Sequence, residues 1–497
     1  MTADDHPEVA TDAGVVRGRW RPTTGGRGAP RSAAFLGIPF AEPPVGALRF
    51  AAPVPKAPWE GVLDAGSYGA TAQRGDPGVV LIPEPSIPGD STLNVNVFTP
   101  SPKAARPDGA GLPVLVWIHG GGYFAGSPAS PWYDGRNFNR DGVITVTISY
   151  RLGFDGFGWI EDAPSNRGVR DWLAALEWVQ RDIAAFGGDP DRVTIAGQSA
   201  GGGAVLTLLG MPAARHLFHG AIVLSGVLAD ASAARAEAFG RDLAARAGVA
   251  PTRAGLSTVP EERILDLQKK ATSIGIRGLR TAFAHGLQLG PTVDDDLLPR
   301  PTSEALRGGA GADEPLVIGT VDDEFAMAFT EGPMGRITPL IPARAVLAAL
   351  AVPKPRRAPY LAANREIGAL GKARLAGRAL SDKMFRVSVP RIAGYRGDAP
   401  TWTYRFSWPS GRFGLAGHCL DVPFFFDCLD GPAVEPLAGA HPPQSLADEI
   451  HSAAVAFVTA QDPGWPRSTA GEPVSRVFDL PSSDRPDAYA SVRPLLG

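Results

Sequence analysis

Hydrophobic residues in this chain gather in short, almost uninterrupted runs. The runs at 112–119 (LPVLVWIH) and 143–149 (VITVTIS) are rich in β-branched residues and have few polar positions. Such runs are typical of strands that are buried on both faces of a sheet. Shorter or alternating segments predict further strands at 31–42, 93–98, 193–196, 221–224 and 316–319.

Other segments carry apolar residues at helical spacing. From Val169 to Phe186 they recur every three or four positions, and the pattern stops at Gly187-Gly188. Residues 200–209 are small or apolar, as in a packed helix. The repeated strand–helix–strand order predicts an α/β fold, with a mostly parallel central sheet and helices on both of its faces.

Two longer stretches, at about 231–290 and 335–395, are mainly helical in pattern and rich in Ala, Leu and Arg. We expect them to be insertions that cover the active-site end of the sheet. No repeat and no low-complexity linker divides the sequence. The pattern therefore predicts that residues 1–497 form one domain with helical insertions.

Composition excludes several classes of protein. The 497 residues are 44% hydrophobic and 20% charged, and the formal net charge of −3 gives no electrostatic reason to expect nucleic acid as a partner. No apolar run is long enough to span a bilayer, and the first residues (MTADDHPEVA) lack the apolar segment of a signal peptide. We therefore expect a cytoplasmic protein that binds no membrane. With two cysteines and no zinc motif, the sequence predicts neither a metal nor another cofactor.

The segment 197–201 (GQSAG) matches the pattern Gly-x-Ser-x-Gly. A predicted strand precedes it and a helix of small residues follows, which is the context of a nucleophile elbow. In such an elbow a sharp turn holds the serine in strained backbone geometry and exposes its Oγ at the carboxyl edge of the sheet. Ser199 is therefore the candidate nucleophile.

A second glycine-rich segment, 119–123 (HGGGY), follows the buried run at 112–119. Glycine lets backbone N–H groups approach a substrate closely enough to stabilise an oxyanion, as acyl transfer requires. The candidate donors are the N–H groups of Gly121, Gly122 and Ala200. A phosphate-binding loop is the alternative, but neither Gly-x-x-x-x-Gly-Lys-Ser/Thr nor Gly-x-Gly-x-x-Gly occurs here.

Several segments, in this order along the chain, resemble one known family, the type-B carboxylesterases of the α/β-hydrolase fold. The matching segments are FLGIPFAEPPVGALRF, LNVNVFTP, VLVWIHGGGYFAGS, ISYRLGFDGF, FGGDPDRVTIAGQSAGGGA, PTVDDDLLP and HCLDVPFFF. The family includes cholinesterases and bacterial p-nitrobenzyl esterases. The resemblance implies that a serine, an acid and a histidine follow one another along the chain and form a catalytic triad.

For the acid, the resemblance implies Glu324, with Asp323 as the alternative. Phe325 stands where the family has glycine. For the histidine, it implies His418, which opens HCLDVPFFF, with Asp421 where the family has glutamate. The other histidines after the acid, at 441 and 451, lie in a proline-containing loop and in a helical pattern, so they are weaker candidates.

The resemblance also implies roles around the triad. Ser225 corresponds to a serine that the family places near the triad, although an ordinary hydroxyl at a strand end explains it equally well. Gln198 replaces the glutamate that the family usually has beside the nucleophile. Two structural ion pairs are implied, Arg49 with Asp90 and Arg151 with Asp171. Because Thr92 replaces a cysteine of the secreted relatives, the disulfide-bounded loop of those relatives is absent, which suits a reducing compartment.

The function expected from these features is hydrolysis of small hydrophobic carboxylic esters through an acyl-enzyme. Hydrolysis of a carbamate or an activated amide by the same machinery is the alternative, and a non-catalytic interaction protein is a remote one. The oligomeric state stays open between monomer and homodimer. The substrate pocket could be lined by four residues that are equally compatible with the core: Tyr123, Phe124, Met327 and Phe329.

Overall fold

The computed structural model describes residues 6–24, 31–75, 81–102, 109–228, 231–272 and 288–496. Within them, one large sheet has the strand order β14-β13-β12-β11-β10-β9-β7-β8-β6-β4-β3. The strands from β8 to β13 along this order are parallel, and the strands at both edges are antiparallel. The strands of this sheet are β3 Arg19–Pro22, β4 Arg31–Pro39, β6 Asn94–Thr99, β7 Leu112–Ile118, β8 Ile144–Ile148, β9 Gly188–Gln198, β10 Gly220–Leu224, β11 Leu316–Val321, β12 Thr401–Phe406, β13 Val474–Phe478 and β14 Ser483–Pro486.

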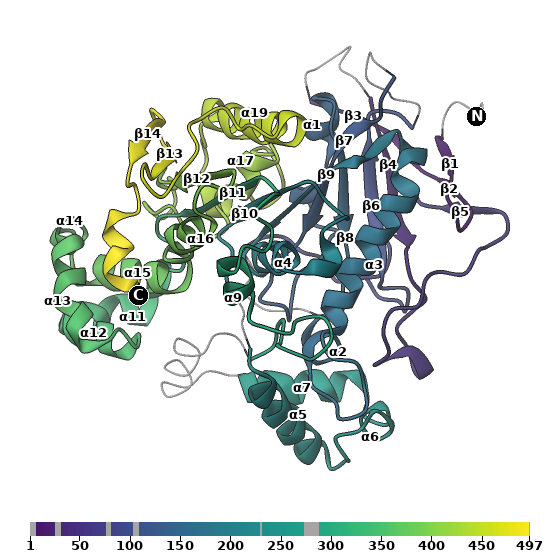
Figure 1. Cartoon of the computed structure of the whole chain (residues 1–497), viewed down its shortest axis with the longest axis horizontal. Helices are drawn as coiled ribbons and strands as arrows, with labels where there is room; N and C mark the ends of the chain where they lie inside the picture. Colours follow the sequence, from purple (N-terminus) through teal and green to yellow (C-terminus); the bar gives the residue numbers. More distant parts are fainter. Residues whose placement is uncertain are drawn as a thin grey trace.

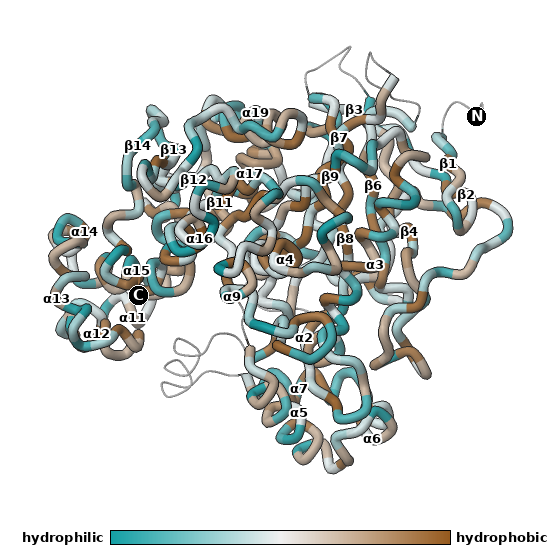
Figure 2. The backbone as a smooth tube through the Cα atoms, in the orientation of Figure 1, coloured by the Kyte–Doolittle hydropathy of each residue, from teal (hydrophilic) through white to brown (hydrophobic). Residues whose placement is uncertain are grey.

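Hydrophobic side chains cover both faces of this sheet. In β7, Val114 and Val116 belong to the core on one face, whereas Leu115 and Trp117 belong to the core on the other. The first face packs against α3 (Arg167–Asp182) and α4 (Ala200–Leu209), and the second packs against α17 (Val422–Phe425) and α19 (Gln444–Ala460). Figure 1 shows the central strands between these helices, and Figure 2 shows that the central strands and α4 are mainly hydrophobic. The predicted α/β architecture is therefore confirmed.

Helices occupy both of the stretches that we expected to be insertions. In the first, the structure describes α5, α6 and α7, and residues 273–287 of that stretch lie outside the described residues. The second contains a series of short helices and a π-helical turn, η6 (Asp382–Arg386), that leads back toward the sheet. The helices in and near these stretches are α5 Ala233–Ala247, α6 Arg253–Ser257, α7 Glu261–Thr272, α9 Thr302–Arg307, α10 Met327–Thr330, α11 Gly332–Ile337, α12 Ala343–Ala349, α13 Lys354–Ala363, α14 Arg365–Ala369, α15 Lys372–Ser381 and α16 Ser388–Arg396.

A small sheet, short helices and 3₁₀ turns complete the structure. A small separate sheet, with the order β1-β2-β5, lies beside the N-terminal part of the large one. Sequence analysis did not predict this small sheet, nor β12, β13 and β14 in the C-terminal part. No helix of the described residues is long and apolar enough to cross a membrane. The remaining elements are β1 Glu8–Ala10, β2 Val15–Arg17, β5 Val62–Asp64, α1 Arg136–Arg140, α2 Gly153–Phe157, α18 Glu435–Ala438 and the 3₁₀ turns at 46–48, 131–133, 183–186, 212–214, 338–340 and 490–495.

Candidate active site

Ser199 lies at the turn between β9 and α4. Its backbone angles are φ 58° and ψ −121°, which non-glycine residues rarely adopt. The turn packs so closely that a Cβ at Gly201 would lie 2.0 Å from the carbonyl oxygen of Ile118. Ser199 is half-buried, while its neighbours Gln198 and Ala200 are buried. The strained backbone and partial accessibility that the sequence predicted for Ser199 are therefore present in the structure.

The glycine loop at 120–122 lies against this turn. A Cβ at Gly120 would lie 3.2 Å from Cβ of Ser199, so the two backbones are close neighbours. Gly121 has φ +96°, and a Cβ there would lie 2.1 Å from the carbonyl oxygen of Ala125, so only glycine fits. Within the described part of the chain, the N–H groups of Gly121 and Gly122 have no hydrogen-bond acceptor.

Ala200 adds a third N–H group beside this loop. Ala200 is the first residue of α4, and the N–H groups in the first turn of a helix have no partner within the helix. Three N–H groups near Ser199 are therefore available to a ligand with a negatively charged oxygen.

Glu324 and His418 form a buried pair. Oε2 of Glu324 is in hydrogen-bond contact with Nδ1 of His418, and the backbone N–H of His418 donates to the carbonyl oxygen of Glu324 at 2.8 Å. Burial lowers the pKa of His418, but the surrounding groups outweigh it, and the pKa lies well above its usual range. Of these groups, Cys419 stays a thiol because burial raises its own pKa. We therefore assign the raised pKa of His418 to the Glu324 carboxylate.

The alternative acid and the other histidines have different partners. Asp323 turns away from His418 and pairs with Arg378, with 3.2 Å between Oδ1 and Nη2. His441 lies exposed in its loop. His451 is buried in α19, where it is hydrogen-bonded to the carbonyl oxygen of Phe425 and to Asp141. Of the candidate acids and histidines, only Glu324 and His418 meet.

The second ring nitrogen of His418 faces a residue that the sequence did not connect to it. Nε2 of His418 lies 3.2 Å from the amide nitrogen of Gln198. No hydrogen bond between Oγ of Ser199 and His418 is found in the part of the chain that the structure describes. Hydrogen bonds of a catalytic site are often formed fully only in complex with substrate. The missing hydrogen bond therefore does not exclude that Ser199 acts together with Glu324 and His418.

Two aromatic rings pack against His418. The centroid of its ring lies 4.4 Å from that of Phe325 and 4.9 Å from that of Phe385. Phe325 follows the acid directly, whereas Phe385 comes from η6, far along the chain. No feature of the sequence connected Phe385 with the site, because a single phenylalanine in a helical pattern is typical of any core position.

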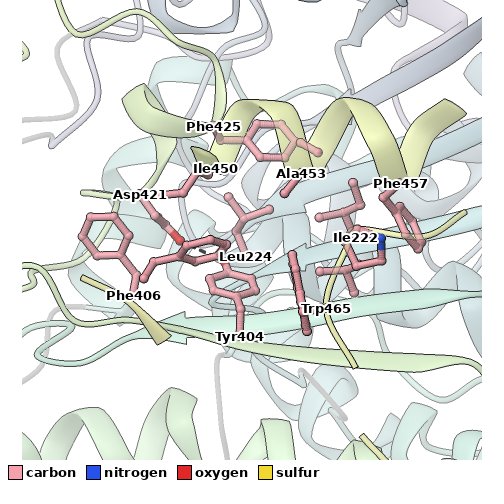
Figure 3. Close-up of a pocket in the computed structure, with 14 residues that line it drawn as sticks. Ile222, Leu224, Tyr404, Phe406, Asp421, Phe425, Ile450, Ala453, Phe457 and Trp465 are labelled. Atoms are coloured by element: carbon pink, nitrogen blue, oxygen red, sulfur yellow. Dashed lines mark hydrogen bonds between the residues drawn. The ribbon is translucent and has the colours of Figure 1, made fainter. Parts of the chain in front are cut away.

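Asp421, three residues after His418, lines a small apolar cavity of about 40 Å³ between the sheet and α19 (Figure 3). Its Oδ2 accepts a hydrogen bond from the Tyr404 hydroxyl at 2.9 Å, and its Oδ1 has no partner among the described residues. Burial, and after it the Glu324 charge, raises the pKa of Asp421 to about 7. Ser225 is buried and its Oγ accepts from the N–H of Val321 at 3.4 Å; among the described residues it has no hydrogen bond with Glu324 or His418.

The four candidate pocket residues do not share one environment. Tyr123 is a correction: it has φ 66°, and its ring is fully buried in the core with Phe157 and Trp172, so it lines no substrate pocket. Phe124 is 56% exposed beside Gly122. The other two, Met327 and Phe329, are half-buried; Met327 lies beside Gly417, and Phe329 packs on the helical insertion.

One of the two implied ion pairs is present. Arg151 and Asp171 form a buried pair with 2.6 Å between Nη2 and Oδ1. The other is a correction: Arg49 pairs with Asp155 at 3.0 Å and not with Asp90. Asp155 takes this position because α2 brings it beside Arg49, which the sequence separation of the two residues did not reveal.

Comparisons with known proteins point to one family over most of the chain. A family model described as "Carboxylesterase family" matches residues 5–338. The chain is similar to para-nitrobenzyl esterase from Bacillus subtilis (strain 168), with 35% identity over 88% of this chain and 87% of that protein. It is also similar to phenmedipham hydrolase from Pseudarthrobacter oxydans, with 32% identity over 93% and 95% of the two chains. A solved structure of PNB esterase has a TM-score of 0.82 at 30% identity and covers 99% of both chains.

Proposed function

We propose that this chain, which belongs to the carboxylesterase family of α/β-hydrolase fold and is a carboxylic ester hydrolase, acts on hydrophobic esters. We propose further that Ser199, His418 and Glu324 form its catalytic triad. The observation that carries the proposal is the buried pair of Glu324 and Nδ1 of His418, which leaves Nε2 directed toward the strained elbow. Apolar rings around His418 and the exposed ring of Phe124 favour hydrophobic substrates.

In the proposed mechanism, Oγ of Ser199 attacks the acyl carbon while Nε2 of His418 takes its proton. Glu324 keeps the other ring proton on Nδ1 and stabilises the imidazolium that forms. The N–H groups of Gly121, Gly122 and Ala200 donate to the oxyanion. His418 then gives its proton to the leaving alcohol, and water attacks the acyl-enzyme by the same route.

The rest of the proposal concerns the setting of this chemistry. We propose that the chain is one catalytic domain that works without a cofactor on a small-molecule ester, as a monomer or a homodimer. Both of its cysteines, Cys419 and Cys428, are buried free thiols. Free thiols persist in a reducing compartment, so we place the enzyme in the cytoplasm.

Replacement of Ser199 tests the proposal. Ser199→Ala should reduce hydrolysis of a short p-nitrophenyl ester to the background rate and should abolish labelling by a fluorophosphonate probe, because the nucleophile is gone. Ser452→Ala, in α19, is the matched control and should keep both. Normal turnover by Ser199→Ala would exclude the mechanism.

Hydrolysis of a carbamate or an activated amide is the second candidate, since the same acyl-transfer groups would serve. A relative named phenmedipham hydrolase, which this chain matches over 93% of its length, favours testing it. The values of kcat/KM for matched ester, carbamate and anilide substrates, and for phenmedipham itself, would rank the two. A higher kcat/KM for the ester supports the first candidate.

A further inference from the structure

Two departures from the carboxylesterase pattern meet at one imidazole. By the resemblance described above, Gln198 takes the place of a glutamate and Phe325 the place of a glycine. In the structure the side-chain amide of Gln198 lies at Nε2 of His418, and the Phe325 ring packs on the same imidazole. Both substitutions therefore change the surroundings of the proposed general base.

We propose that Gln198 is a positioning residue that donates a hydrogen bond to Nε2 of neutral His418, so that the imidazole waits in the form that can take a proton from Ser199. The inference rests on the proposed function, since it concerns the same base. With the amide nitrogen turned toward the ring, the 3.2 Å contact is a hydrogen bond only when Nε2 carries a lone pair, because an amide nitrogen can only donate. The ring proton is then on Nδ1, where the Glu324 carboxylate accepts it.

The Gln198 side chain is fixed in this place. Gln198 is 1% exposed, and a Cβ at Gly120 would lie 3.1 Å from its Oε1, so the amide oxygen lies along the glycine loop while the nitrogen faces His418. Phe325 and Phe385 pack against the imidazole and against each other, with 5.7 Å between their centroids. The ring is thus held by contacts with Gln198, Phe325 and Phe385.

The amide and the carboxylate differ in the charge state of His418 that they favour. Glu324 raises the pKa of His418, and a hydrogen bond from Gln198 to the neutral ring opposes that rise. A glutamate at 198 would instead accept from Nε2–H and favour imidazolium, which cannot act as a base. The titratable groups that face the ring are Glu324 from the acid loop and Cys419 and Asp421 from its own segment, and η6 presents only the apolar Phe385. Gln198 leaves Glu324 as the single carboxylate in contact with the ring.

The pH profile of kcat/KM for Gln198→Glu tests the inference. An added carboxylate within hydrogen-bond distance should move the acid limb upward by about 1–2 pH units. Below the limb, kcat/KM should fall by about 10- to 100-fold, and on the plateau it should stay within about threefold of wild type. Gln288→Glu adds the same charge at an exposed position and should leave the profile unchanged. An unshifted limb, or an equal loss at every pH, would show that Gln198 is merely structural.

Selective ¹⁵N-histidine labelling gives a readout that does not depend on hydrolysis. The His418 signal, assigned by its loss in His418→Asn, should show the proton on Nδ1 and an unprotonated Nε2 in the active pH range. Gln198→Glu should raise its midpoint of titration, and Gln198→Asn, which shortens the side chain away from Nε2, should raise it by less. An unchanged midpoint in both variants overturns the inference while wild-type hydrolysis still supports the proposed function. Absence of hydrolysis by the wild type would instead overturn the proposed function.

Discussion

Replacing Glu324 by glutamine should remove most of the hydrolysis, whereas the same exchange at its neighbour Asp323 should not. The two carboxylates are adjacent in the chain and both are buried, yet their partners differ. Glu324 contacts Nδ1 of His418, and Asp323 pairs with Arg378 at 3.2 Å. The pair of variants therefore separates a loss of catalysis from a loss of folding.

The expected magnitude follows from the contact at Nδ1. Glu324→Gln places an uncharged amide there, which no longer stabilises imidazolium and whose NH₂ group favours the tautomer with its proton on Nε2. In Ser-His-Asp enzymes the corresponding exchange lowers kcat by about 10⁴-fold. Oε1 of Glu324 has no hydrogen-bond partner among the described residues, so no second hydrogen bond of the carboxylate holds the side chain. We expect a loss of about 10³- to 10⁴-fold in kcat, or roughly 4–5.5 kcal/mol.

Asp323→Asn should act on stability. Asparagine can still accept from Arg378, and Asp322 lies 3.7 Å from the same guanidinium, so Arg378 keeps an anionic neighbour. The free energy of unfolding should fall by about 1–3 kcal/mol, with kcat within about threefold of wild type.

Hydrolysis of a short p-nitrophenyl ester gives kcat, and urea unfolding gives stability for both variants. If Asp323→Asn lost kcat and Glu324→Gln kept it, the acid would be wrongly assigned. If both lost kcat equally, the acid loop would act only as a folded unit, and the argument from the Nδ1 contact would fail.

Three further perturbations test other parts of the structure. Phe325→Gly removes a ring at 4.4 Å from His418 and should lower kcat by about 3- to 10-fold with little change in KM; an unchanged kcat would mean that the ring does not hold the imidazole. Asp421→Asn keeps the hydrogen bond from Tyr404 but removes a carboxyl group whose pKa is raised to about 7. In the wild type, ionisation of this carboxyl group lowers the free energy of unfolding as the pH rises from about 4 through 7. Urea unfolding should therefore show the variant gaining about 2 kcal/mol relative to wild type between pH 5 and pH 8, and a constant difference would contradict this. Arg151→Met leaves the carboxylate of Asp171 buried without its partner and should cost about 3–5 kcal/mol of unfolding free energy, against at most about 1 kcal/mol for an exposed control, Arg17→Met.

The sequence predicted those parts of the molecule that depend on short-range order. The elbow at Ser199 and the loop at Gly121 each lie within a few residues of a strongly hydrophobic strand, so pattern and motif supported each other. The strand β12 was also within reach, because Trp402, Tyr404 and Phe406 alternate with polar residues. It was missed because no motif drew attention to it.

Contacts between distant parts of the chain could not be predicted in the same way. Gln198 and His418 are separated by 220 positions, and Phe385 reaches the site only because η6 returns to the sheet. The prediction for Tyr123 was wrong for a local reason. Its positive φ turns the side chain into the core, although its neighbour Phe124 is exposed.

The helical stretch at 335–395 does more than cover one end of the sheet. Arg386, at the end of η6, is fully buried between Asp382 at 2.8 Å and Asp322 of the acid loop at 3.5 Å. Removing one partner from a buried charge pair costs about 3–5 kcal/mol, so a movement of η6 away from the acid loop would carry a cost of that order for each pair it broke. The same turn presents Phe385 to His418. Because the charges that hold the acid loop and the ring that packs on the base come from one element, the geometry of Glu324 and His418 depends on the folded state of the insertion.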